Sequence, residues 1–185
     1  MNIQSIRRGL LAALTAGTLL FSACEQAPAP VSESAKDFAH VDMTAATLDV
    51  QGLADHLLQN VTFDDPNLIA MDSAIAETLY NIAGLTEAAV SYGSTGATAE
   101  AVLVLKCASV ENAEAAKARI DQYRTEMAAV YADYNEPESG KLTNALLSAD
   151  GVYVVFCVSP DAKAAEAAYH AYVTDAVYGG AEAAE

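Results

Sequence analysis

The segment from Gly93 to Gly96 carries residue types that nucleophilic catalysis uses. Such catalysis needs a serine or cysteine beside a base, a third group that orients the base, and N–H donors for the developing oxyanion. Ser94 lacks the G-x-S-x-G spacing of a nucleophile elbow, and the segment joins two expected strands rather than a strand and a helix. We interpret it as a hairpin turn. Contact between its backbone N–H groups and an anion is the alternative.

Histidines and carboxylates are the next candidates, as metal ligands or as acids and bases. His40, His56 and His170 are the only histidines, and none forms a close ligand pair, so we predict no metal site. Asp64 and Asp65 offer oxygen ligands for calcium, but the twelve-residue EF-hand pattern is missing and an Asp-capped turn is favoured. Paired acids for glycoside chemistry stay open, because their separation is a three-dimensional property. The sequence contains no catalytic motif and predicts no cofactor.

Two cysteines and several tyrosines lie near expected structural elements. Cys107 and Cys157 each fall near the end of an expected strand. A disulfide would need Cα atoms within about 7 Å, so with the strand order unknown a disulfide and two buried free thiols both stay open. The tyrosines either line a binding surface or pack in a core that lacks tryptophan; they include Tyr123, Tyr131, Tyr134, Tyr169 and Tyr172.

The third cysteine, Cys24, follows a pattern typical of secretion. Arg7 and Arg8 precede the apolar stretch from Gly9 to Phe21, and small residues then lead to Cys24. A helix of this length spans about 20 Å, which is short of the roughly 30 Å hydrocarbon core. The run LLFSAC is similar to a bacterial lipobox, in which the cysteine is diacylglyceryl-modified and becomes the mature N-terminus. The pattern therefore predicts a chain anchored by lipid at the extracytoplasmic face of the cell membrane.

These features divide the chain into four expected parts. Residues 1–23 form a lipoprotein signal peptide, and residues 24–43 comprise the lipidated cysteine and a flexible tether rich in Ala, Pro, Ser and Glu. Residues 44–178 form a single α+β domain, and residues 179–185 form a disordered tail.

Composition limits the partners of that domain. The chain has 185 residues, of which 53% are hydrophobic and 18% are charged, and its formal net charge is −16. This length suits one modest domain rather than a multidomain enzyme. The acidic surplus repels phosphate backbones, so we predict no nucleic-acid partner.

Periodicity and turn signals predict the order helix, helix, then strand, strand, helix twice over (ααββαββα). Two hairpins would form an antiparallel four-stranded sheet packed against the helices. The last strand lacks polar alternation, so we expect it to be interior and covered on both faces. Asp49, Asp72 and Ser159 are the expected helix caps. The long helix is expected to bury Ile120, Tyr123, Met127, Val130 and Tyr134. The expected helices span residues 49–61, 72–84, 111–133 and 159–176, and the expected strands span 88–94, 101–107, 142–148 and 152–158.

The chain resembles the bacterial family known as domain of unknown function 4358. The segments SYGSTGATAEAVLVLKCAS and KLTNALLSADGVYVVFCVSPDAKAAEAA carry the resemblance, which extends over residues 49–176. Glu100 before the second strand and the Asp150-Gly151 turn are among its marks, whereas Cys107 and Cys157 depart from the expected pattern. The resemblance implies a lipoprotein of mostly Gram-positive bacteria and carries no mechanism.

We therefore expect a non-catalytic binding or interaction module of the cell envelope, acting on an unidentified envelope protein or ligand. Two alternatives stay open. One is a small extracytoplasmic enzyme that uses dispersed carboxylates, and the other is a lipoprotein that binds cations or solutes, prompted by the net charge. An enzyme should show a concave pocket with convergent acids, whereas an interaction module should show an apolar patch or groove.

Overall fold

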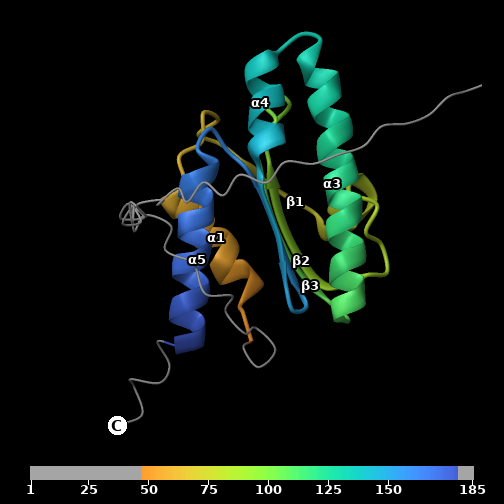
Figure 1. Cartoon of the computed structure of the whole chain (residues 1–185), viewed down its shortest axis with the longest axis vertical. Coiled ribbons are helices and arrows are strands. Elements are labelled where there is room, and N and C mark those ends of the chain that lie inside the picture. Colours follow the sequence, from red (N-terminus) through yellow and green to blue (C-terminus); the bar gives the residue numbers. More distant parts are fainter. Residues whose placement is uncertain (1–46, 179–185) are drawn as a thin grey trace, which may run out of the picture. The chain divides into compact units, whose positions relative to one another are not determined.

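A five-stranded antiparallel sheet forms the centre of the fold (Figure 1). The computed structural model describes residues 47–178. The strands lie in the order β1-β2-β3-β5-β4, and every neighbouring pair is antiparallel. Their bounds are β1 (Ile69–Met71), β2 (Thr86–Gly93), β3 (Ala101–Cys107), β4 (Leu146–Asp150) and β5 (Tyr153–Val158).

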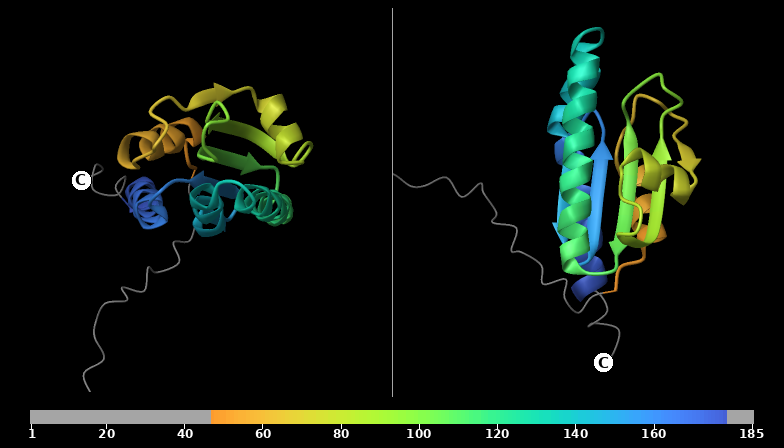
Figure 2. Two further views of the ribbon diagram at one scale, coloured as in Figure 1. Left: turned by 90° about the horizontal axis from the view of Figure 1, so that it is seen from above. Right: turned by 90° about the vertical axis from the view of Figure 1, so that its right-hand side faces the viewer.

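Helices cover both faces of this sheet, as the two views of Figure 2 show. On one face, α1 (Val50–Asn60) and α5 (Ala162–Tyr178) bury a core with Val102 and Val104 of β3 and Val155 of β5. On the other face, α2 (Ser73–Leu79), α3 (Val110–Ala132) and α4 (Glu136–Asn144) cover the leucines of β3 and Phe156 of β5. None of the helices in the described range is both long and apolar enough to span a bilayer.

Two of the three interior strands, β3 and β5, are buried along almost their whole length. Side chains of a strand alternate between faces, so Leu103 and Leu105 enter one core while Val102 and Val104 enter the other. Every residue of β5 is buried, because helices cover both of its faces. The prediction of an interior strand without polar alternation is confirmed.

Capping side chains define where the first two helices begin. The Asp49 carboxylate accepts a hydrogen bond from the Gln51 N–H at 3.1 Å, and the Asp72 carboxylate accepts one from the Ala74 N–H at 2.9 Å. Both predicted caps are confirmed. The second helix ends at Leu79, earlier than predicted, and Gly84 lies in the following turn with a φ of 76°.

The predicted four-stranded sheet and its element order are wrong in two places. The strand β1 was not predicted, because three residues are too few to show periodicity. The helix α4 was not predicted either, because Pro137 and Gly140 suggested a loop. Proline fits the first turn of a helix, since its missing N–H would have no partner there, and Lys141 in the last turn suits the helix dipole. The observed order is αβαββααββα.

Two further predictions about helices are wrong in detail. In α3 the predicted buried face includes Val130 and Tyr134, but these side chains are 50% and 69% exposed. The buried face is rotated toward Ala128 and Tyr131, because these residues face the sheet. In α5 the cap is provided by Asp161, whose carboxylate accepts from the Ala164 N–H at 3.0 Å; the predicted cap, Ser159, is buried.

Candidate functional site

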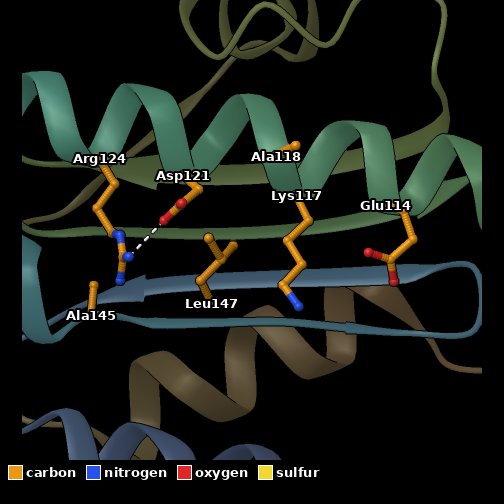
Figure 3. A pocket seen from close by; sticks show the side chains of 7 residues that line it. All are labelled: Glu114, Lys117, Ala118, Asp121, Arg124, Ala145 and Leu147. Atoms are coloured by element: carbon orange, nitrogen blue, oxygen red, sulfur yellow. Dashed lines mark hydrogen bonds and ion pairs between the residues drawn. The ribbon is translucent and has the colours of Figure 1, made fainter. Parts of the chain in front are cut away.

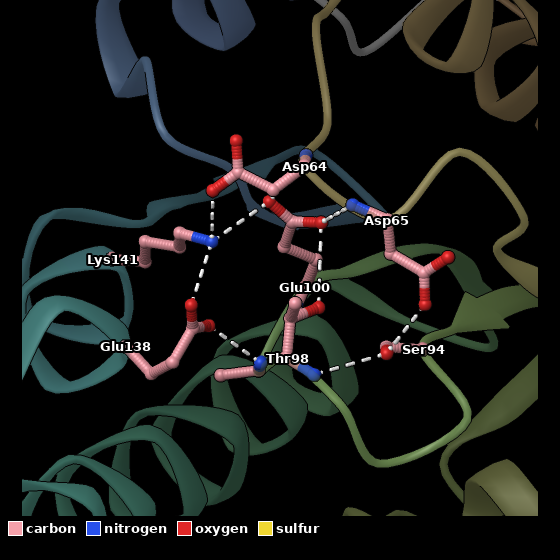
Figure 4. A network of polar contacts seen from close by, with 8 residues as sticks. Asp64, Asp65, Ser94, Thr98, Glu100, Glu138 and Lys141 are labelled. Atoms are coloured by element: carbon pink, nitrogen blue, oxygen red, sulfur yellow. Dashed lines mark hydrogen bonds and ion pairs between the residues drawn. The ribbon is translucent and has the colours of Figure 1, made fainter. Parts of the chain in front are cut away.

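A buried lysine lies at the end of the sheet where the β2–β3 hairpin, α4 and the α1–β1 loop meet (Figure 4). The Lys141 ammonium contacts Asp64 Oδ2 at 2.7 Å, Glu138 Oε1 at 2.8 Å and Glu100 Oε1 at 3.0 Å. An ammonium has three N–H donors, so these three carboxylates can use all of them. Only 8% of the Lys141 side chain is exposed.

Glu100 is the most buried member of this cluster, with none of its side chain exposed. Its Oε1 accepts from the Asp64 N–H at 2.9 Å and its Oε2 from the Asp65 N–H at 2.8 Å. With Lys141 on Oε1 and the Thr98 hydroxyl on Oε2 at 3.3 Å, four donors surround the carboxylate. A carboxylate offers about four acceptor positions, so the Glu100 side chain is fully satisfied.

Glu138 completes the connection between α4 and the hairpin. Its Oε2 accepts from the Ala99 N–H at 2.7 Å, while Oε1 faces Lys141. The cluster therefore ties together three segments that are distant in sequence. We call Asp64, Glu100, Glu138 and Lys141 the buried clamp, in which Glu100, Glu138 and Lys141 are buried while 62% of the Asp64 side chain is exposed.

Charge balance explains how the clamp tolerates burial. Burial alone would lower the pKa of Lys141, but hydrogen bonds with Asp64, Glu138 and Glu100 outweigh it and raise that pKa. The ammonium therefore stays charged at neutral pH. Three carboxylates around one ammonium leave formal negative charge, which the N–H groups of the loop and hairpin offset.

The hairpin residues between β2 and β3 form a second layer of contacts. Ser94 Oγ donates to Asp65 Oδ2 at 2.7 Å and accepts from the Thr98 N–H at 3.2 Å. Hydrogen bonds from the Ser94 hydroxyl and the Asn67 N–H lower the pKa of Asp65. Ser94 thus joins the turn to the α1–β1 loop, as Figure 4 shows, and the group beside its hydroxyl is the Asp65 carboxylate rather than an imidazole.

A pocket of about 170 Å³ lies beside the clamp, and the same hairpin forms one of its walls. Its remaining walls come from β1, α2, α3 and α4. The rings of Tyr80 and Tyr123 meet edge to face, with centroids 4.8 Å apart. We call this the tyrosine pocket, and its aromatic and apolar side chains are those of Met71, Leu79, Tyr80, Ala99, Ala101, Tyr123, Met127, Tyr131 and Leu142.

The phenols of this pocket are neutral. Burial raises the pKa of Tyr80, of Tyr123 and of Tyr131, and neighbouring tyrosines add to the effect. The pocket therefore offers ring faces, thioethers and uncharged hydroxyls. Such a lining suits an uncharged, largely apolar group.

The structure places the predicted candidate residues apart from one another. His56 on α1 lies against Tyr172 of α5, with ring centroids 5.3 Å apart, and His170 lies 3.9 Å from Glu166 on α5. Within the described part of the chain, no cluster of three or more His, Cys, Asp or Glu side chains could hold a metal ion. Cys24 and His40 lie outside the described residues.

Cys107 and Cys157 are free and buried, in different cores. The register pairs Cys157 with Val102, and Cys107 lies five positions further along β3, a distance of about 17 Å. A disulfide between them would need Cα atoms within about 7 Å. Burial raises the pKa of Cys107 to about 11 and that of Cys157 to about 12, so both are thiols at neutral pH.

The tyrosines divide between surface and core. Tyr123 and Tyr131 line the pocket, and Tyr134 is exposed next to them on the C-terminal side of α3. Tyr169 is buried on α5 and donates to Asp150. Sequence reasoning missed the clamp, because Glu138 and Lys141 both fell in an expected loop rather than on a helix.

Comparison with known proteins gives one match. The model of the family described as Domain of unknown function (DUF4358) matches residues 62–159, which is more than half of the chain. The matched range contains the whole buried clamp and every residue that lines the tyrosine pocket. No curated protein matches the chain, and no solved structure matches it.

Proposed function

The chain belongs to the family of domain of unknown function DUF4358, and from this premise we propose that it is a non-catalytic binding domain of the cell envelope. In this proposal a lipid on Cys24 anchors it at the outer face of the cytoplasmic membrane. The tyrosine pocket receives an apolar side chain of a partner protein.

One observation carries the proposal: the ionisable groups beside the pocket are saturated. Glu100 has four donors around its carboxylate, and the three donors of Lys141 face three carboxylates. A general acid or base needs access to a substrate proton within hydrogen-bond reach. The clamp instead holds the hairpin that forms a wall of the pocket, which supports a structural role for its charges.

The dimensions of the pocket favour one group of a larger partner. Sites for drug-sized molecules occupy about 300–1,000 Å³, and this pocket has about 170 Å³. Exposed apolar side chains lie on or next to the helices that line it: Ile75 and Leu79 on α2, Val130 on α3, and Tyr134 in the turn that follows α3. Apolar and aromatic residues around a small pocket are typical of protein interfaces.

Photo-crosslinking in intact cells tests the pocket. A benzoylphenylalanine at Tyr134 should yield a cross-linked partner band from the full chain. Met127→Glu places a charge in the pocket and should abolish the band, whereas Met127→Leu and Thr125→Glu, on the exposed part of α3, should retain it. A band unchanged by Met127→Glu would contradict binding at this pocket.

Cell fractionation tests the anchor separately. Cys24→Ala should move the protein from the membrane fraction to the medium, because the acyl chains would be lost. Cys107→Ala is a matched control and should leave the protein in the membrane fraction. Unchanged membrane retention of Cys24→Ala would contradict lipidation.

A further inference from the structure

A groove of about 360 Å³ runs between α3 and the strand β4 (Figure 3). It shares no lining residue with the tyrosine pocket. Ala118, Ala145 and Leu147 provide its apolar surface. Along α3 the charged side chains alternate in sign, as Figure 3 shows, and their spacing places them on one side of the helix. We call them the charged row: Glu114, Lys117, Asp121 and Arg124.

The strand beneath this row is an edge of the sheet. Within the described residues β4 pairs only with β5, and its sequence, LLSAD, contains neither lysine nor proline. Edge strands that lack such protection are open to pairing with another chain. The other edge strand, β1, has three residues, whereas β4 has five.

The turn between β4 and β5 fixes which backbone groups face outward. Asp150 pairs with Tyr153 across a two-residue turn whose Gly151 has a φ of 59°, a conformation that favours glycine. The closing pair of such a turn is hydrogen-bonded, and the pattern alternates along the strand. Leu147 and Ala149 therefore direct their N–H and C=O groups away from β5.

We propose that this edge pairs with the same edge of a second copy of the chain. A two-fold axis near Ser148 makes β4 antiparallel to its copy and places Leu147 opposite the partner's Ala149. Both residues then exchange N–H···O=C bonds, and the two sheets join into one. Such an isologous interface needs a surface that is complementary to itself.

The charged row has this self-complementarity. Its signs along α3 are minus, plus, minus, plus, and a two-fold axis reverses the order on the second copy. Glu114 then faces Arg124 of the other copy, and Lys117 faces Asp121. Each pair combines opposite charges, so the row is attractive to its own copy although each chain carries a net charge of −16.

The distances permit this contact. The helix α3 contacts β4, β5 and β3. Three strand spacings separate the two β5 strands of the pair, which is about 14 Å, and charged side chains from both α3 helices can meet across that span. In the single chain Asp121 contacts Arg124 at 2.6 Å, while Glu114 and Lys117 have no ion-pair partner within the described residues. The pairing gives these two side chains partners.

Disulfide trapping tests the strand pairing. In an antiparallel pair the Cβ atoms of directly opposite residues lie about 4.5–5.5 Å apart. In the full chain with Cys24→Ala, Ser148→Cys should form covalent dimers when a copper–phenanthroline oxidant takes two electrons and two protons from the paired thiols. Ser73→Cys, exposed on α2, is the control. Equal trapping at both positions would overturn the proposal.

Charge reversal tests the row. Lys117→Glu should raise the dimer dissociation constant about tenfold, because two attractive pairs become repulsive. The double variant Lys117→Glu/Asp121→Lys has the signs minus, minus, plus, plus, which are again self-complementary, and should restore association. Sedimentation equilibrium measures both. A monomer at all concentrations up to the millimolar range, or association insensitive to Lys117→Glu, would overturn the proposal.

Discussion

Lys141 and Lys117 place the same side chain in opposite settings. Lys141 is enclosed by three carboxylates within hydrogen-bonding distance and is 8% exposed, whereas Lys117 lies over a groove and has no ion-pair partner in the described part of the chain. An unpaired charge costs much free energy when it is buried and little when solvent reaches it. The buried clamp can therefore stabilise the fold, while the charged row is free to select a partner.

The largest expected effect comes from removing the ammonium of the clamp. Lys141→Ala leaves the carboxylates of Glu100 and Glu138 buried without their cation, so the free energy of unfolding should fall by about 3–5 kcal/mol. Because the pKa of Lys141 is raised, this stabilisation is present below its ordinary value of 10.5 and is lost only as the pH rises through the folded-state pKa. Urea unfolding measures the loss. A change below about 1 kcal/mol would mean that Lys141, like Lys117, contributes little to the stability of the fold.

A smaller effect should follow from neutralising one carboxylate of the clamp. Glu138→Gln keeps an oxygen acceptor for the Ala99 N–H but loses the charge that faces Lys141. We expect a loss of about 1–3 kcal/mol in the free energy of unfolding, the range for hydrogen bonds to charged groups. Glu136→Gln, exposed on the same helix, is the control; equal losses at both positions would argue against a specific role for Glu138.

The hairpin contact should give a smaller, pH-dependent effect. Hydrogen bonds lower the pKa of Asp65, so its carboxylate stabilises the fold above the ordinary value of 3.8, and this contribution is lost as the pH falls through the lower folded-state pKa. Asp65→Asn should therefore unfold more easily than the parent chain at pH 7, and the two chains should converge in stability once the pH falls below the lowered pKa of Asp65. The urea midpoints of both chains from pH 7 downward measure this difference in stability. A difference that widens toward low pH would refute the stabilising role of the Asp65 carboxylate.

The smallest expected effect belongs to the charged row. Lys117→Ala should change the stability of the monomer by no more than about 0.5 kcal/mol, because this half-buried side chain has no ion-pair partner to lose within the described residues. Urea unfolding of a dilute sample measures it. A loss comparable to that of Lys141→Ala would mean that Lys117 supports the fold.

The fold could be predicted from sequence where local signals and tertiary packing agree. Asp49 and Asp72 cap helices because their side chains reach N–H groups two residues away, which sequence can show. The interior strand β5 could be recognised from its continuous apolar run. The turn at Gly151 could also be placed, because the residue pattern is local.

The candidate site could not be predicted, because its contacts are distant in sequence. Glu100 and Lys141 are 41 positions apart, and Glu100 and Asp64 are 36 apart. Only the fold brings them together. Local signals at Pro137 and Gly140 favoured a loop, while the charges at both ends of α4 and its packing favoured a helix. Likewise, the packing of α3 against its neighbours determines which of its tyrosines, Tyr123 and Tyr131, line the pocket.

The dependence of the urea midpoint on protein concentration tests both clusters in one measurement. A protein that associates only when folded has a midpoint that rises with concentration. The parent chain should show this rise, Lys117→Glu should weaken it while keeping the midpoint of the dilute chain, and Lys141→Ala should lower the midpoint at every concentration. A parent chain whose midpoint is independent of concentration, or a Lys141→Ala chain as stable as the parent, would contradict the account.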